Sequence, residues 1–195
     1  EVSQIARTLA RYLGLNEDLS ETLSLSHDLG HAPFGHAGEE VLSQCMERYG
    51  GFNHNIQTLR VVTSIENKYY KFYGLNLTIE TLDGLIKHNG PVKNLAPYKK
   101  ILRRDLFSNK IVFSTFPSLE AQVAAISDDI AYNNHDLEDG LRAGLFTIKK
   151  VSSIPYISEL INKHFKNIKN FRREIIISQI VRDLINSMVV DVINT

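Results

Sequence analysis

The sequence predicts an all-α protein. Apolar residues recur at helical spacing along most of its 195 residues. Glycine and proline interrupt these periodic segments, and residues suited to cap a helix stand before two of them. An apolar content of 43% and a charged content of 23% are ordinary for a globular chain that buries a core. We therefore expect a helical fold.

The expected helices follow one another through short connections. The first ends at Gly14, and Asn16 can cap the second, which runs to His27-Asp28. Carboxylates in the first turn of that second helix favour its positive end. Thr78 can cap another helix, which Gly90 and the following proline stop. The remaining expected helices cover about 36–48, 53–68, 118–141, 156–167 and 172–194.

Composition excludes several classes of protein. Lys plus Arg and Asp plus Glu both total 22, so no net charge draws the chain to nucleic acid or to a membrane surface. The single cysteine, Cys45, excludes an internal disulfide and a cysteine-based zinc site. No apolar run approaches the roughly 20 residues that span a bilayer. We expect a cytoplasmic protein without membrane contact.

Both ends suggest that more chain exists. The sequence opens at Glu1 inside a helical pattern, and it closes on an apolar stretch at 187–193. We expect a piece of a longer protein.

A basic stretch connects two of the expected helices. It covers residues 87–110 and contains one acid, Asp105, against seven basic residues. One interpretation is a solvated face, and the other is contact with phosphate or a polynucleotide. The basic residues are Lys87, Lys93, Lys99, Lys100, Arg103, Arg104 and Lys110.

Histidines concentrate at the end of the second expected helix. Three of the seven histidines, with one aspartate, fall within residues 27–36. Imidazole and carboxylate together suit a divalent ion such as Mn, Fe, Co, Ni or Zn. The alternative is a dense run of surface histidines. The four residues are His27, Asp28, His31 and His36.

A second cluster of candidate residues lies on the long helix expected at 118–141. Residues 117–140 contain six acids and no Lys or Arg. Asp128, Tyr132 and Asp136 share one polar face, since they stand four residues apart. Crowded acids repel one another unless a cation or a donor-rich ligand lies opposite, although a solvated surface is the alternative. The expected apolar stripe is Leu119, Val123, Ile126, Ile130, Leu137 and Leu141.

Four stretches of the sequence form a recognisable series: HDLGHAPFGHAGEE at 27–40, GFNHNIQTLR at 51–60, KHNG at 87–90 and SLEAQVAAISDDIAYNNHDLEDGLRAGL at 118–145. Through these stretches the chain resembles the HD-domain phosphohydrolases, and among them the deoxynucleoside triphosphate triphosphohydrolases. The resemblance implies an HD-domain helical bundle at 1–146, with a metal site between helices, and the start of a C-terminal helical region at 147–195.

The resemblance implies one divalent metal ion, with Mn or Mg expected and Fe, Co, Ni or Zn as alternatives. The family holds it through a histidine, an adjacent His-Asp pair and a distant aspartate. The last three match His27, Asp28 and Asp128, which stands four residues before the family's tyrosine. The first histidine would precede Glu1, outside this sequence.

The resemblance also implies a catalytic pair at His36 and Glu39. Three residues apart at a helix start, these side chains share a face, and a carboxylate raises the basicity of an imidazole that it binds. His88 is either a further residue near the site or a structural histidine at a helix end. The family positions that meet the substrate match His31 and His54 for the phosphates, and Tyr132 and Asp136 for the sugar.

The implied reaction is hydrolysis of a deoxynucleoside triphosphate, dGTP-like, to deoxynucleoside and inorganic triphosphate. Family members typically form homo-oligomers. Three alternatives remain open. One is a zinc peptidase, because HDLGH resembles HExxH. Another is an HD phosphohydrolase acting on nucleotide monophosphates or cyclic nucleotides. The third is a non-catalytic nucleotide-binding or assembly subunit.

Overall fold

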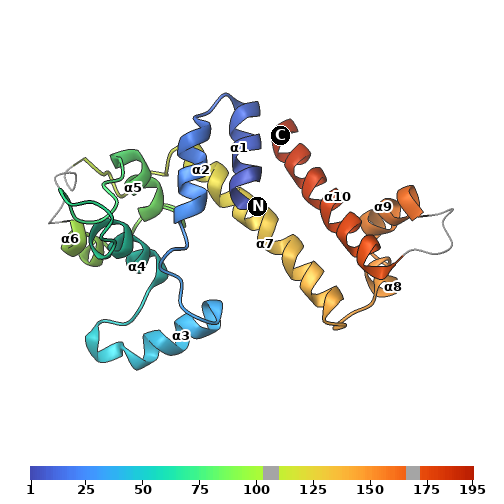
Figure 1. Ribbon diagram of the computed structural model, residues 1–195, viewed down its shortest axis with the longest axis horizontal. Helices are drawn as coiled ribbons and strands as arrows, with labels where there is room; N and C mark the ends of the chain where they lie inside the picture. Colours follow the sequence, from blue (N-terminus) through green and yellow to red (C-terminus); the bar gives the residue numbers. More distant parts are fainter. Residues whose placement is uncertain (103–109, 166–171) are drawn as a thin grey trace. The chain divides into compact units, whose positions relative to one another are not determined.

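The computed structural model describes residues 1–102, 110–165 and 172–195, without the side chains of 164 and 165. All regular structure in these ranges is helical, which confirms the expected fold class (Figure 1). A 3-10 turn at Glu47–Tyr49 and a π-helical turn at Val61–Ile65 accompany the α-helices. The α-helices are α1 (Val2–Leu13), α2 (Glu17–Ser26), α3 (Gly35–Cys45), α4 (His54–Arg60), α5 (Ile79–Ile86), α6 (Ala96–Leu102), α7 (Leu119–Arg142), α8 (Ile148–Val151), α9 (Pro155–Phe165) and α10 (Arg173–Asn194).

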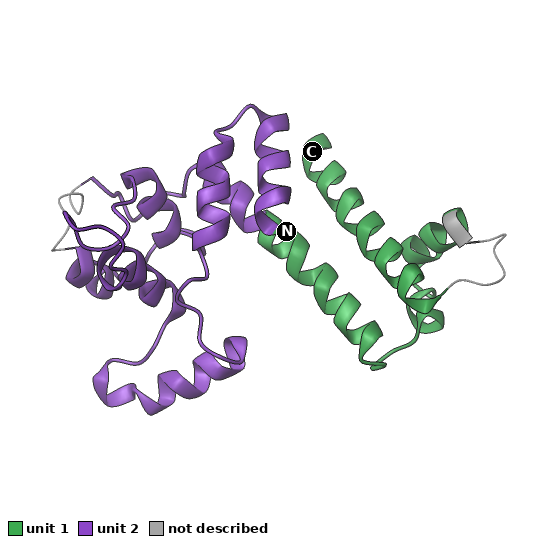
Figure 2. Ribbon diagram, in the orientation of Figure 1, with its two compact units in different colours: residues 1, 127–195 green, residues 2–126 purple. Residues whose placement is uncertain are grey.

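The chain forms two compact units (Figure 2). In chain order, we call residues 2–126 the first unit (purple, unit 2 in the key of Figure 2) and residues 127–195 together with Glu1 the second unit (green, unit 1 in the key). The boundary falls within α7. The domain boundary after residue 146, which came from the family resemblance, stays a prediction. None of the described helices has the length and apolar character needed to cross a membrane.

Side-chain caps begin several helices where the sequence predicted them. The Asn16 side chain accepts a hydrogen bond from the Leu19 N–H at 3.0 Å, and Thr78 caps α5. Asn53 caps α4 in the same way, through the N–H of Ile56 at 3.1 Å. Each cap satisfies an N–H group that has no partner within the helix, so each helix start is fixed by its own sequence.

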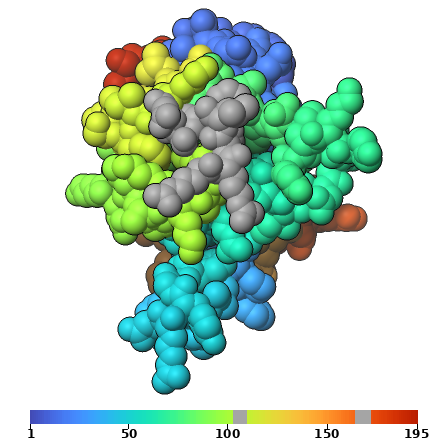
Figure 3. All heavy atoms as spheres, turned by 90° about the vertical axis from the view of Figure 1, so that its left-hand side faces the viewer, coloured from blue at the N-terminus to red at the C-terminus, as the bar shows by residue number. Residues whose placement is uncertain are grey.

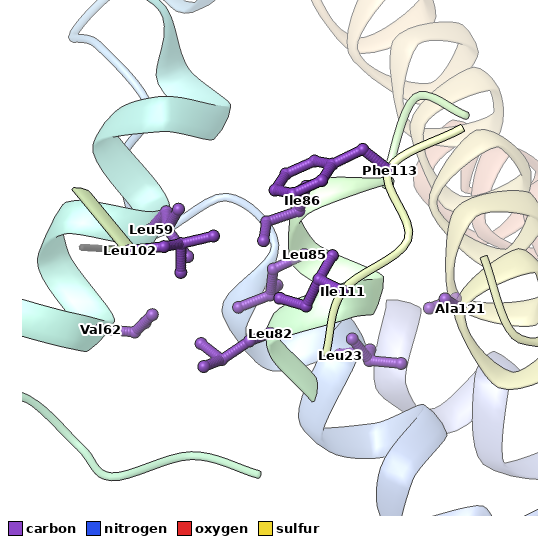
Figure 4. Packing of buried hydrophobic residues seen from close by; sticks show 11 residues of the cluster. Leu23, Leu59, Val62, Leu82, Leu85, Ile86, Leu102, Ile111, Phe113 and Ala121 are labelled. Carbon is purple, nitrogen blue, oxygen red and sulfur yellow. The ribbon is translucent and has the colours of Figure 1, made fainter. Parts of the chain in front are cut away.

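The core of the first unit gathers one apolar face from each of several helices (Figure 4). Leu23 of α2, Leu59 of α4 and Leu82 of α5 are at most 2% exposed. A Cβ on Gly84 would stand 2.5 Å from Leu23 Cδ2, so the glycine lets α5 lie close to α2 without displacing the Leu23 side chain. The other buried members are Val62, Leu85, Ile86, Leu102, Ile111, Phe113, Ala121 and Ala124.

The second unit has its own apolar core, formed by α8, α9, α10 and the end of α7. The guanidinium of Arg173 donates to the Leu141 carbonyl, which joins the start of α10 to the end of α7. The buried core residues are Leu141, Val151, Ile157, Ile177, Ile180 and Val181.

α3 differs from its neighbours because none of its residues is buried. Figures 1 and 3 show it, in cyan, projecting from the remainder of the first unit. Apolar packing therefore contributes little to its position, and polar contacts must supply the rest.

The sequence-based prediction was wrong in part for two helices: the end of one and the apolar face of the other. The helix expected at 53–68 ends at Ile65, where a π-helical turn leads into an exposed loop. On α7, Val123, Ile130 and Leu141 of the expected stripe are buried, but Leu119 and Ile126 are 59% and 36% exposed. Ala121 and Ala124, which the expected stripe left out, belong to the core of the first unit.

Neither a solvated face nor a phosphate-binding face describes every residue of the basic stretch at 87–110. It contains α6, on which Lys99 and Lys100 are exposed. Lys87, by contrast, is only 2% exposed and therefore belongs to the interior. Arg103 and Arg104 lie outside the described residues.

We expect Leu59→Ala to lower the free energy of unfolding by about 2–5 kcal/mol, since it leaves a cavity in the core of the first unit. Urea unfolding followed by circular dichroism measures this. The control is Leu25→Ala, because Leu25 is 64% exposed and its loss changes stability by about 0.5 kcal/mol or less. Equal losses in the two variants would contradict the core assignment.

Candidate active site

The loop after α2 is fastened to α4 by one hydroxyl. Thr58 Oγ1 accepts a hydrogen bond from the Gly30 N–H at 2.9 Å and donates one to the His27 carbonyl at 2.9 Å. A Cβ on Gly30 would stand 2.1 Å from the backbone nitrogen of Thr58, so the contact requires glycine. This junction fixes where the chain leaves His27 and where it reaches His31.

Glu39 of α3 binds two histidines through one carboxylate. Its Oε1 accepts from the backbone N–H of His54 at 2.8 Å, and the His54 ring Nδ1 lies 2.9 and 2.8 Å from the two oxygens. The Nδ1 of His36 lies 3.4 Å from Oε2. His54 opens α4, whose N-terminal end favours a negative charge. The carboxylate thus holds α3 against the start of α4.

His31 completes a group of three imidazoles around Glu39. Its ring stacks on that of His54 with centroids 4.9 Å apart, and lies 5.1 Å from that of His36. Potential ligand atoms of these three histidines and Glu39 all lie within 4.8 Å of one another, so the group could hold a cation or an anion. The His36 side chain is 73% exposed, which leaves it accessible to a ligand.

The environment keeps the Glu39 carboxylate ionised. Burial raises the pKa of Glu39, but hydrogen bonds from the His54 backbone and ring outweigh burial, so the pKa lies below the ordinary 4.5. A carboxylate bonded to Nδ1 fixes the imidazole tautomer, and Nε2 of His54 and His36 is then the atom that meets a ligand.

His27 and Asp28 form a donor pair at the end of α2. The Nδ1–H of His27 donates to the Ser24 carbonyl at 2.9 Å, and Nε2 lies 3.4 Å from Asp28 Oδ2. The hydrogen bond with His27 lowers the pKa of Asp28, and burial opposes it. A ring nitrogen held by a backbone carbonyl is typical of a metal-binding histidine. The donor types and their orientation therefore fit a divalent ion.

The structure adds His88 to this pair. The His88 ring follows the end of α5 and lies 4.7 Å from the His27 ring, with an angle of 35° between their planes. The sequence singled out the KHNG stretch but left the role of His88 open. Its position depends on how α5 packs against α2, which the sequence does not state.

The acidic candidates of α7 belong to the second unit. Asp128 is half-buried, while Tyr132 and Asp136 are exposed. The contact of Asp128 with an ion at His27 stays a prediction, as do the contacts of Tyr132 and Asp136 with a sugar.

The peptidase alternative does not fit the backbone. α2 ends at Ser26, and residues 27–30 form a turn. The HExxH motif needs both histidines on one helical face, so HDLGH cannot form that site here.

An all-helical unit with a His-Asp pair at a helix end and further imidazoles nearby agrees with the comparison to known protein families. Residues 1–133 match the model of the HD domain, and the chain belongs to this family.

The curated relatives are named deoxyguanosinetriphosphate triphosphohydrolase-like proteins. One from Pelagibacter ubique is 56% identical over 189 residues, covering 97% of this chain and 51% of the relative. Another from Parvibaculum lavamentivorans is 50% identical over 198 residues, covering 100% of this chain and 50% of the relative. One from Caulobacter vibrioides is 50% identical over 194 residues, covering 98% and 49%. The chain spans about half the length of these relatives.

We expect Glu39→Gln to lower the free energy of unfolding at pH 7 by about 1–3 kcal/mol, because the amide cannot accept every bond that the carboxylate accepts. The pKa of Glu39 is lowered on folding, so its stabilisation is present above about pH 4.5 and is lost as the pH falls through the folded pKa. The difference from wild type should shrink below that pH in urea titrations. Glu40→Gln, at an exposed neighbour, is the control; a Glu39→Gln difference constant from pH 7 to pH 3.5 would contradict the assignment.

Proposed function

We propose that the protein hydrolyses deoxynucleoside triphosphates, dGTP-like, to deoxynucleoside and inorganic triphosphate. We base this on the Glu39 carboxylate that two histidines share and on the His27–Asp28 donor pair, whose loop Thr58 joins to the helix that His54 opens. The names of the curated relatives support the choice of substrate.

The proposed metal ligands are His27, Asp28 and Asp128, with the family's first histidine expected upstream of Glu1. The resemblance to the family supports Asp128, because it stands four residues before Tyr132, which matches the family's tyrosine. A bound Mn or Mg ion, or Fe, Co, Ni or Zn, would draw charge from an α-phosphate oxygen and lower the pKa of an attacking water.

The proposed reaction breaks the bond between the α-phosphorus and the 5′-oxygen. That oxygen leaves as a hydroxyl and needs a proton, which His36 supplies as general acid while Glu39 holds its ring. His31 and His54 donate to phosphate oxygens and offset their charge. On α7, Tyr132 packs against the deoxyribose and Asp136 accepts from its 3′-hydroxyl.

The test is product analysis with Mn²⁺ and each deoxynucleoside triphosphate. We compare this chain with the same chain preceded by the upstream segment that carries the family's first histidine. The expected products are deoxynucleoside and triphosphate in equal amounts, with higher activity in the extended protein. Turnover only of nucleotide monophosphates or cyclic nucleotides would favour the other HD phosphohydrolases. Nucleotide binding without any turnover would favour a binding or assembly subunit.

We expect Asp128→Ala to reduce triphosphate release in the extended protein to about one hundredth or less, since loss of a ligand costs at least as much as loss of an outer contact. Asp129→Ala is the matched control, because Asp129 is exposed on a different side of the same helix. Kinetics of triphosphate release measure both. Similar losses in the two variants would contradict the role of Asp128.

His36→Asn should lower kcat by about 10²- to 10⁴-fold with little change in Mn²⁺ affinity, because it removes a proton donor and leaves the proposed ligands in place. His135→Asn, at another exposed histidine, should leave kcat near wild type. Steady-state kinetics with metal titration separate these effects. A His36→Asn variant that loses metal affinity but keeps kcat at saturating metal would overturn the assignment.

A further inference from the structure

Lys87 is a buried lysine to which the proposed chemistry gives no role. Its side-chain Nζ lies 2.7 Å from Asp83 Oδ1 and donates to Thr115 Oγ1 at 2.9 Å. The Thr115 hydroxyl in turn donates to the Val112 carbonyl at 2.8 Å. A buried ammonium is costly unless it is paired, so these contacts hold Lys87 in one position. They also join the end of α5 to the segment before α7.

Backbone hydrogen bonds before and after His88, the residue that follows Lys87, fix its position. The Lys87 N–H donates to the Asp83 carbonyl at 3.1 Å, and the Lys87 carbonyl accepts from the Gly90 N–H at 2.7 Å. Gly90 has a φ of 92°, a conformation that favours glycine and closes the turn. His88 lies inside this turn, so its backbone has little freedom.

The position of His88 relative to His27 suits a shared ion. The two ring centroids are 4.7 Å apart, and ligand nitrogens of the two rings lie within 4.8 Å of each other. Two imidazoles that bind one ion at about 2.0–2.1 Å bring their ring centres to roughly 5 Å. The Nδ1 of His27 is already committed to the Ser24 carbonyl, which directs Nε2 to the ion.

We propose that His88 is a further ligand of the metal ion assigned to His27 and Asp28, and that Lys87 is the residue that positions it. This inference rests on the metal centre of the proposed function. A further imidazole favours ions with affinity for nitrogen, such as Co or Zn, over Mg, which prefers oxygen ligands. His88 therefore sets both affinity and choice of ion.

The first test replaces the imidazole of His88 by a phenyl ring, which can still pack against His27 but cannot bind a metal ion. His88→Phe should weaken Co²⁺ binding by at least about tenfold and Mg²⁺ binding less, in calorimetric titrations of the 195-residue chain. His135→Phe, at an exposed histidine, should bind Co²⁺ as wild type does. Wild-type Co²⁺ affinity in His88→Phe would show that the ring only packs against His27, and would overturn the inference.

Co²⁺ binding at His27 and His88 must be distinguished from binding at the imidazoles around Glu39. His36→Asn alters the group around Glu39 and leaves His27 and His88 intact. The His36→Asn variant should therefore keep the Co²⁺ site that His88→Phe weakens. Loss of that site in His36→Asn, but not in His88→Phe, would place the ion at Glu39 and overturn the inference.

The second test addresses Lys87. Lys87→Met should weaken Co²⁺ binding about tenfold or more, while Lys93→Met, at an exposed lysine, should not. The double variant Lys87→Met/His88→Phe should bind no more weakly than His88→Phe alone, because both changes act through one ring. Additive losses would show a role for Lys87 independent of His88. Should Lys87→Met fail to fold in urea titrations, Asp83→Asn tests the same contact and should also weaken binding.

The outcomes separate this inference from the proposed function. Co²⁺ binding that requires His27 but not His88 overturns the inference and leaves the proposed function standing. No Co²⁺ or Mn²⁺ binding by wild type overturns the metal centre, and the inference with it. Metal binding without triphosphate release contradicts only the proposed reaction.

Discussion

The close contact between Gly30 and Thr58 is the constraint on which the candidate site depends. The Thr58 hydroxyl binds both the carbonyl of His27 and the N–H of Gly30, so it sets the loop between the His27–Asp28 pair and His31. The absence of a side chain at Gly30 lets this loop lie directly on the α4 backbone. His54 opens the same helix, so this junction relates the loop after His27 to the start of α4. A larger residue at 30 would have to displace the α4 backbone beside the core residue Leu59.

In four histidines of the first unit, the Nδ1 atom lies against an oxygen of the protein. The Nδ1 of His27 lies against a backbone carbonyl at 2.9 Å, that of His31 against another at 3.3 Å, and those of His36 and His54 against Glu39. A proton held on Nδ1 leaves Nε2 to bind an ion, a phosphate or a proton in transfer. The backbone and one carboxylate thus prepare a set of imidazoles for ligands, which is consistent with both the proposed metal centre and the proposed proton transfer.

The two anchors of the site differ in their physical nature. α3 buries no residue, so its position depends on the charge-assisted bonds of Glu39. α5 is anchored by Leu82 and Leu85 in the core, and the Lys87–Asp83 pair adds a polar contact at its end. Removal of one partner from a buried ion pair leaves the other charge unpaired, which destabilises the fold. We therefore expect changes at 39 and 87 to affect the stability of the first unit as well as the site.

The sequence by itself determined the helical fold class and the caps at Asn16 and Thr78, and it supplied the candidate site residues, because periodicity, capping and residue type are local properties. It placed His36 and Glu39 on one face, and the two side chains lie 3.4 Å apart. Only the tertiary structure decided that Glu39 also binds His54, that His88 stands against His27, and that Lys87 is buried. These contacts join segments 15 to 61 residues apart, and their geometry follows from how α3, α4 and α5 pack rather than from any single stretch of sequence.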